Sequence, residues 1–203
     1  MSQSSSGRVA AGKLSGANGP MRHDAFTITL HWLTAVLVVA QFVLAEFWGF
    51  APRPIRGLMI GTHMSFGILL TAIVVLRIGW RLTGGSRISN ASDATELLSR
   101  AVHYLLYGLL AAEAVLGFTL RWSGGEDMHF FGLLIPPPFA PFSRPAHQLV
   151  GEAHNLIAWA IIVLAAGHAA AALFHHYVLR DDVLGRMLPA RFARVMKGIA
   201  PQA

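Results

Sequence analysis

The fold of this chain is decided by residues 150–178, which read VGEAHNLIAWAIIVLAAGHAAAALFHHYV. The stretch is apolar over more than the roughly 20 residues that a helix needs to cross a bilayer. Two histidines interrupt it, His154 near its start and His168 fourteen residues later. Because a helix rises about 1.5 Å per residue with 3.6 residues per turn, both rings leave the same face about 21 Å apart. We therefore expect a membrane-spanning helix with a polar site near each end.

Three more apolar runs of similar length precede this one. They lie at about 26–47 (FTITLHWLTAVLVVAQFVLAEF), 58–80 (LMIGTHMSFGILLTAIVVLRIGW) and 101–121 (AVHYLLYGLLAAEAVLGFTLR). Single spans of this kind satisfy their backbone hydrogen bonds in lipid only as helices. The sequence therefore predicts an all-α integral membrane four-helix bundle over residues 25–180. A disordered polar tail at 1–24 is expected before it and a basic cytoplasmic tail at 181–203 after it.

The composition also points to a bilayer. Of the 203 residues, 54% are hydrophobic and 13% are charged, whereas soluble proteins carry about 25% charged residues. The chain has no cysteine, which excludes disulfides, iron–sulfur clusters, thiolate-ligated haem and covalently attached haem. The net charge of +6 does not indicate nucleic acid, because the basic residues lie mainly outside the apolar runs.

The basic residues predict the orientation of the bundle. Twelve of the 16 Lys and Arg residues lie in the N-terminal tail, around the connection between the second and third runs, or after the fourth run. The other four, Arg53, Arg56, Arg121 and Arg144, lie on the opposite side. By the positive-inside rule, both termini are cytoplasmic. The long, proline-rich connection at 122–146 then lies outside, where we expect it to cover the bundle as a lid.

Four histidines inside the predicted spans fall at two matched depths. His63 and His154 share the outer level, and His31 and His168 share the inner level. Intramembrane polar residues are costly and mark functional sites by default, and two facing neutral imidazoles are what a six-coordinate b haem requires. The sequence thus predicts two b haems between the helices. Separate histidines that hydrogen-bond within the bundle are the alternative, while zinc or copper would call for further ligands.

Short motifs around these histidines match those of a known family. They are TLHW at 29–32, FWGFAPRPIRG at 47–57, GTHMSFG at 61–67, HAAAALFHHY at 168–177 and RMLP at 186–189. Through them, residues 22–192 resemble the bacterial branch of the cytochrome b561 family, whose members are four-helix, di-haem, quinone-reactive proteins of the bacterial inner membrane. The chain departs from the family in its polar tail at 1–21 and in Glu113, which occupies a position where we expect an apolar residue.

The resemblance also implies ligands and an activity. The family pairs a first-helix with a fourth-helix histidine on the cytoplasmic side, and a second-helix with a fourth-helix histidine on the outer side. Its ligands carry over to His31, His63, His154 and His168. In particular, the chain resembles the family member that acts as a superoxide oxidase. This resemblance implies superoxide as electron donor and ubiquinone as acceptor.

Further histidines lie near the inner level. His175 follows His168 by one heptad and continues the same helix face, with His176 and Tyr177 beside it. These side chains could bind a quinone carbonyl or relay its protons, and a solvated helix end is the alternative. His103, near the start of the third span, could compete as an inner ligand. The related proteins carry a non-ligand histidine there, so we favour a role beside the haem or the quinone over that of a ligand, with a hydrated interfacial histidine as an equal alternative.

Charged residues flank both levels. Arg77 and Arg81 end the second span near the inner level, where they could pair with haem propionates or reach lipid headgroups. We expect Arg53 and Arg56 to lie in the short outer connection and to clamp a propionate or attract an anion. Glu113 could move protons, but an uncharged acid bonded to a backbone carbonyl is favoured.

Together these features predict an oxidoreductase that transfers electrons from superoxide at the outer face to ubiquinone near the cytoplasmic face. His175, His176, Arg53 and Arg56 are its predicted substrate-handling residues. The alternative is an electron-relay cytochrome b subunit, which passes electrons between a partner dehydrogenase or hydrogenase and the quinone pool and docks through the 122–146 connection. A transporter that uses the intramembrane histidines is disfavoured, because the sequence lacks broken, repeated helices.

Overall fold

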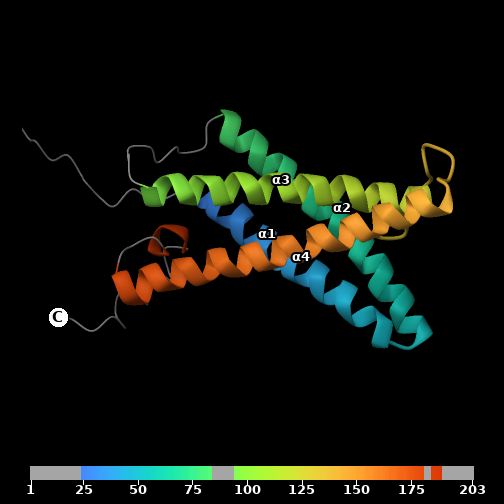
Figure 1. The fold of residues 1–203 in the computed structure, drawn as a ribbon, viewed down its shortest axis with the longest axis horizontal. Helices are drawn as coiled ribbons and strands as arrows, with labels where there is room; N and C mark the ends of the chain where they lie inside the picture. The colour runs from blue at the N-terminus through green and yellow to red at the C-terminus, as the bar shows by residue number, and fades with distance from the viewer. Residues whose placement is uncertain (1–23, 84–93, 181–183, 189–203) are drawn as a thin grey trace, which may run out of the picture.

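Four long helices make up most of the structure, a computed structural model that describes residues 24–83, 94–180 and 184–188. They are α1 (Ala25–Phe47), α2 (Arg53–Thr83), α3 (Ala94–Ser123) and α4 (Arg144–Phe174), shown in Figure 1. The short turn η1 (Trp48–Phe50) joins α1 to α2, and the π-helical turn η2 (His175–Leu179) extends α4. The predicted tails at 1–24 and 181–203 lie almost entirely outside the described residues.

The helices pack as two antiparallel pairs. α1 lies mainly against α2 and α3 mainly against α4, and the two pairs cross each other (Figure 1). The starts of α1 and α3 and the ends of α2 and α4 meet at one end of the bundle, which we call the terminal end. The opposite end, where the 124–143 connection runs from α3 to α4, we call the loop end.

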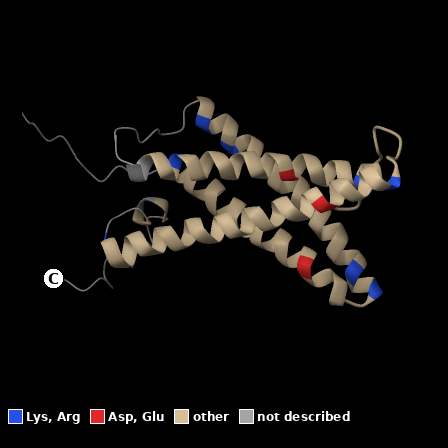
Figure 2. Cartoon of the chain, viewed as in Figure 1, with Lys and Arg blue, Asp and Glu red and all other residues tan. Residues whose placement is uncertain are grey.

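The outward faces of the helices are apolar. Each helix is long and apolar enough to cross a membrane, and Val36, Leu156 and Val163 are each more than 60% exposed. Soluble proteins rarely expose apolar surface of this extent. Basic residues, blue in Figure 2, lie toward the helix ends. The structure therefore confirms an all-α four-helix bundle suited to a bilayer.

The buried core is small and lies between α1 and α2. Leu30, Leu37 and Ile73 form it, and partly buried side chains of α2 pack around them. A small core is expected here because lipid, rather than protein, covers most of the apolar side chains.

Two helices begin earlier than their apolar runs. α2 starts at Arg53 and α4 at Arg144, whereas the sequence indicated about 58 and about 150. Pro54 and Pro145 each lie in the first turn, where the fixed backbone angle of proline suits a helix and its missing N–H is not needed. Apolarity marks only the part of a helix that lies in hydrocarbon, so it cannot show these polar extensions.

The loop-end connection contains a small hairpin that the sequence did not predict. Strand β1 (Met128–Phe130) pairs antiparallel with β2 (Leu133–Ile135), through a two-residue turn with positive φ at Phe131 (46°) and Gly132 (93°). Positive φ at both positions matches the twist of a hairpin, and glycine adopts it without strain. Ser65 of α2 anchors the turn, because its hydroxyl accepts a hydrogen bond from Phe131 N over 3.0 Å. The hairpin therefore docks on α2.

Candidate functional site

At the loop end, α2 and α4 bring two predicted ligands close together. The ring centres of His63 and His154 lie 6.4 Å apart, with the ring planes at 83°. The edge of the Trp48 indole packs on His63, with ring centres 5.2 Å apart. Both histidines are partly buried within the bundle. Helices from different pairs thus present two imidazoles to one space.

At the terminal end, α1 and α4 repeat this arrangement. The ring centres of His31 and His168 are also 6.4 Å apart, with the planes at 70°. His154 and His168 are fourteen residues apart on α4, so the two pairs are separated by about 21 Å along that helix. The structure therefore brings together the same two pairs that the sequence indicated.

The spacing of each pair suits one metal ion between two imidazoles. A metal–imidazole bond is about 2 Å long, and the centre of a five-membered ring lies about 1.1 Å from its atoms. Two imidazoles on opposite sides of one metal ion therefore have centres about 6.3 Å apart. Within the described residues, no group of three or more His, Cys, Asp or Glu could hold a metal ion. Haem fits this donor set, because its macrocycle supplies the other nitrogen ligands, whereas bare zinc needs three or four from the protein.

Each loop-end histidine has an oxygen near its Nδ1 atom. His63 Nδ1 donates to the backbone carbonyl of Gln41 over 3.2 Å. His154 Nδ1 lies 3.1 Å from Oε1 of Glu113, a residue of α3. Such partners fix which ring nitrogen is left to bind a metal. The sequence favoured a Glu113 bonded to a backbone carbonyl, whereas its carboxyl group faces the His154 ring instead.

His103 of α3 joins the terminal-end pair. Its ring centre lies 4.9 Å from that of His168, and its Nδ1 donates to the carbonyl of Ser99 over 2.6 Å. His103 therefore packs beside the His31–His168 pair. We expected His103 in this neighbourhood. The geometry gives no reason to assign it, rather than His31, as the partner of His168.

Two arginines of α2 line the same end. The Arg77 guanidinium lies 3.5 Å from Nδ1 of His31 and over the ring of Tyr107, 5.3 Å from its centre. Arg81 lies in the same way over Tyr104, at 5.5 Å. These cation–π contacts hold both guanidinium groups against α3. The terminal end therefore carries fixed positive charge close to its histidines.

His175 and His176 lie in the π-helical turn η2, and His176 packs its ring edge-on against Tyr177 at 4.9 Å. His175 is seven residues beyond His168, about 10 Å further along the helix. Single π-turns within α-helices occur frequently at functional sites. The two histidines thus lie at the outermost turn of the terminal end rather than beside the His31–His168 pair.

The prediction that Arg53 and Arg56 lie in a connecting loop is wrong, because both lie in the first turn of α2. Arg56 donates to the backbone carbonyls of Trp48, Gly49 and Ala51 over 3.1, 2.9 and 3.4 Å. Its guanidinium thus holds the start of α2 against the turn η1, where the Trp48 carbonyl also accepts from Ala51 N. Arg53 is exposed on the same helix turn.

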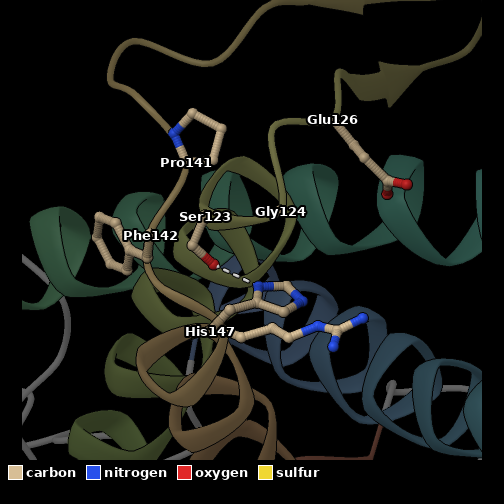
Figure 3. A pocket seen from close by; sticks show the side chains of 7 residues that line it. Ser123, Gly124, Glu126, Pro141, Phe142 and His147 are labelled. Carbon is tan, nitrogen blue, oxygen red and sulfur yellow. Dashed lines mark hydrogen bonds between the residues drawn. The ribbon is translucent and has the colours of Figure 1, made fainter.

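His147 lies in the first turn of α4, before the apolar run of that helix begins. Its Nδ1 lies 2.8 Å from the hydroxyl of Ser123, which is only 1% exposed. These residues border a cavity of about 290 Å³ at the loop end, shown in Figure 3. Its lining is Ser123, Gly124, Glu126, Pro141, Phe142, Arg144 and His147.

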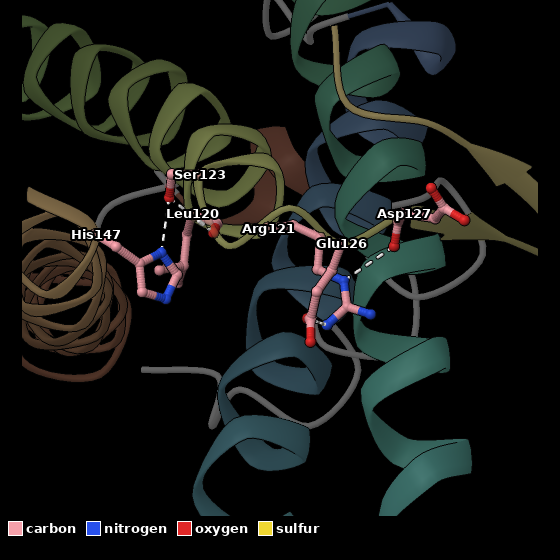
Figure 4. A network of polar contacts seen from close by, with 6 residues as sticks. All are labelled: Leu120, Arg121, Ser123, Glu126, Asp127 and His147. Atoms are coloured by element: carbon pink, nitrogen blue, oxygen red, sulfur yellow. Dashed lines mark hydrogen bonds and ion pairs between the residues drawn. The ribbon is translucent and has the colours of Figure 1, made fainter. Parts of the chain in front are cut away.

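A second polar contact closes the base of the same connection. Arg121 forms an ion pair with Glu126 and donates from Nε to the backbone carbonyl of Asp127 over 2.9 Å (Figure 4). The Ser123–His147 contact then ties α3 to α4 (Figure 4). The Arg121 contacts are local in the sequence, whereas the Ser123–His147 contact joins residues 24 positions apart. We read this region as a structural clamp on the connection.

Comparison with known proteins supplies the family context. The family model described as prokaryotic cytochrome b561 matches residues 22–190. Cytochrome b561 homolog 2 of Escherichia coli strain K12 is 31% identical over 180 residues, covering 86% of this chain and 95% of the relative. The probable superoxide oxidase CybB of Yersinia pestis is 30% identical, covering 84% of this chain and 97% of the relative. Cytochrome b562 of Cereibacter sphaeroides is 29% identical, with coverage of 81% and 93%.

Proposed function

The chain belongs to the prokaryotic cytochrome b561 family, and from this membership we propose that it is a di-haem superoxide:ubiquinone oxidoreductase of the bacterial inner membrane. Membership already establishes a multi-pass bacterial membrane protein with an electron-transfer role in a family that binds b haems. The observation that carries the proposal is the pair of facing histidine sets, each with ring centres 6.4 Å apart. One haem at each end of α4 gives a path across the bundle.

In this proposal the four histidines would hold the two haems. His63 and His154 hold the loop-end haem, and His31 and His168 hold the terminal-end haem. When bound, a b haem accepts and releases one electron at a time at its iron. With the termini in the cytoplasm, as the positive-inside rule indicates, the loop end faces outward. The bundle keeps both sites apart from water and at fixed depth.

Superoxide is the donor in this proposal, and the similarity to a probable superoxide oxidase supports it. Each superoxide ion loses one electron and leaves as dioxygen, so two ions are consumed per ubiquinone. Arg53 supplies exposed positive charge at the loop end. Arg56 lies next to it, but its donors are shared with backbone carbonyls. We assign the attraction of superoxide mainly to Arg53, because focused positive charge raises the capture rate of a small anion.

Ubiquinone is reduced at the terminal end in this proposal. One ubiquinone takes up two electrons and two protons to become ubiquinol. His103 lies beside the terminal-end pair, and His175 and His176 lie about two helical turns beyond it. Imidazoles can donate to a quinone carbonyl and pass protons from the cytoplasmic side. Arg77 and Arg81 contribute positive charge for haem propionates there.

A relay subunit remains the second candidate, and the docked hairpin favours it. Phe131, Leu133 and Leu134 are 67%, 61% and 52% exposed at its tip. An exposed apolar cluster on a fixed hairpin is typical of a contact with another protein. Under this reading, a dehydrogenase or hydrogenase docks at the loop end and delivers the electrons.

A pulsed-superoxide experiment separates the two candidates. The purified haem-loaded protein is placed in liposomes that contain ubiquinone, and haem absorbance and ubiquinol are followed after each pulse. We expect haem reduction within the pulse and one ubiquinol for every two superoxide ions. Arg53→Gln should slow the second-order reaction and flatten its salt dependence, since exposed charges are screened over about 8 Å at physiological ionic strength. Haems that stay oxidised in the unmodified protein would rule out superoxide and favour the relay reading.

A further inference from the structure

Glu113 is a buried acid within a membrane-spanning helix, and its carboxylate faces His154. Oε1 lies 3.1 Å from Nδ1 of His154, and both side chains are about four-fifths buried. Within the described residues, neither Glu113 Oε2 nor His154 Nδ1 has a well-aligned hydrogen-bond partner. Burying such atoms without a partner is costly. A hydrogen bond between the Glu113 carboxyl group and the His154 ring would offset this cost.

The His154 ring packs closely against helix α3. Gly117 lies one turn beyond Glu113 on the same face, and a Cβ atom built on it would lie 3.3 Å from Cε1 of His154. Glycine at this position lets the imidazole lie directly against the α3 backbone. The same contact holds Nδ1 toward Glu113. Nε2 is then the nitrogen left to bind a metal ion.

The side chains near the proposed ligands differ in kind from one end of the bundle to the other. At the loop end, His154 faces the Glu113 carboxylate, while His63 faces a neutral carbonyl. At the terminal end, the Arg77 guanidinium lies 3.5 Å from His31. A carboxylate that accepts from a ligating histidine makes the imidazole more basic. It thereby favours the oxidised metal, whereas a nearby cation favours the reduced one.

We propose that Glu113 is a positioning residue for His154. It accepts a hydrogen bond from Nδ1 of the metal-bound ring and lowers the reduction potential of the loop-end haem below that of the terminal-end haem. This inference rests on the proposed function only in that His154 is a ligand of the loop-end haem. Electrons then move toward higher potential from the loop end to the terminal end, which is the direction that the proposed reaction requires.

A redox titration of the purified holoprotein tests the role of Glu113. The His63→Leu variant shows which midpoint belongs to the loop-end haem, because that variant should lose this haem and its midpoint. We expect Glu113→Gln to keep two haems and to raise the midpoint of the loop-end haem by about 59 mV, a tenfold change in its equilibrium for one electron. Glu152→Gln is the matched control, because Glu152 is an exposed acid near His154 in the sequence that pairs with Gln148. It should move neither midpoint by a comparable amount.

Two outcomes would overturn the inference. The first is that both midpoints stay unchanged in Glu113→Gln, and the second is that Glu152→Gln shifts the loop-end haem equally. If Glu113→Gln does not fold, Glu113→Asp retains the carboxyl group but shortens its reach, and an unchanged loop-end midpoint in that variant would also refute the role. The ligand assignment fails separately, if His154→Leu retains both haems. Midpoints do not depend on the donor, so rejection of superoxide would leave this result intact.

Discussion

Enlarging Gly117 should displace the ring of His154 and release one haem. A Cβ atom at Gly117 would lie 3.3 Å from Cε1 of His154, slightly closer than ordinary contact. In Gly117→Ala the His154 ring would therefore have to move by a few tenths of an ångström. This shift is close to the roughly 0.2 Å that metal–ligand distances tolerate. Valine places further methyl groups about 1.5 Å beyond Cβ, which would force a shift of about 1 Å.

We therefore expect a graded loss of haem. Gly117→Ala should retain nearly two haems per chain, and Gly117→Val should retain about one, with the terminal-end haem unchanged. Helix propensity does not explain such a loss, because alanine and valine both favour a helix over glycine. Haem per chain is measured as the pyridine haemochrome against protein concentration, and reduced-minus-oxidised spectra show which haem remains.

Gly108 provides the matched control on the same helix. A Cβ atom built there meets no atom within 4 Å among the described residues, so Gly108→Val should keep both haems. The reasoning would be refuted if Gly117→Val bound two haems with an unchanged spectrum. It would also fail if Gly108→Val lost as much haem as Gly117→Val, because the loss would then come from the helix rather than from the His154 ring.

Four further substitutions test other parts of the structure. His63→Leu should remove mainly the loop-end haem and His31→Leu mainly the terminal-end haem, and two haems in both variants would reject the ligand assignment. His175→Ala should slow ubiquinol formation while reduction of the loop-end haem by superoxide stays intact; unchanged turnover would place the quinone pocket elsewhere. Ser65→Ala removes the acceptor of the partly exposed Phe131 N–H, a loss of about 0.5–1.5 kcal/mol, so that amide should exchange with deuterium faster and the thermal midpoint should fall; equal exchange rates would contradict the anchoring role.

Much of the fold could be read from the sequence because a bilayer restricts what a chain can do. Lipid offers no hydrogen-bond partners, so long apolar runs must be helices. The helical period then fixes the face and depth of each histidine on its own helix. His154 and His168 are on one face because fourteen residues are nearly four turns. Depth also indicated the pairing with His63 and His31, which the structure brings to 6.4 Å.

The ends of the helices were less predictable. Arg53 and Arg56 looked like loop residues because polarity marks the edge of hydrocarbon rather than the end of a helix. Pro54 was a usable signal, since proline suits a first helical turn. The hairpin at β1 and β2 had a weaker signal in Gly132. It forms partly because Ser65, more than sixty residues earlier, supplies an acceptor for the turn.

The sequence by itself determined four membrane-spanning helices and two levels of histidines, because hydropathy and helical period act within each segment. Only the tertiary structure decided what lies around each ring. Glu113 reaches His154, Gln41 reaches His63 and His103 packs on His168 because α1, α3 and α4 adopt particular rotations and crossings. Those rotations follow from side-chain packing between helices, which a one-dimensional pattern does not encode.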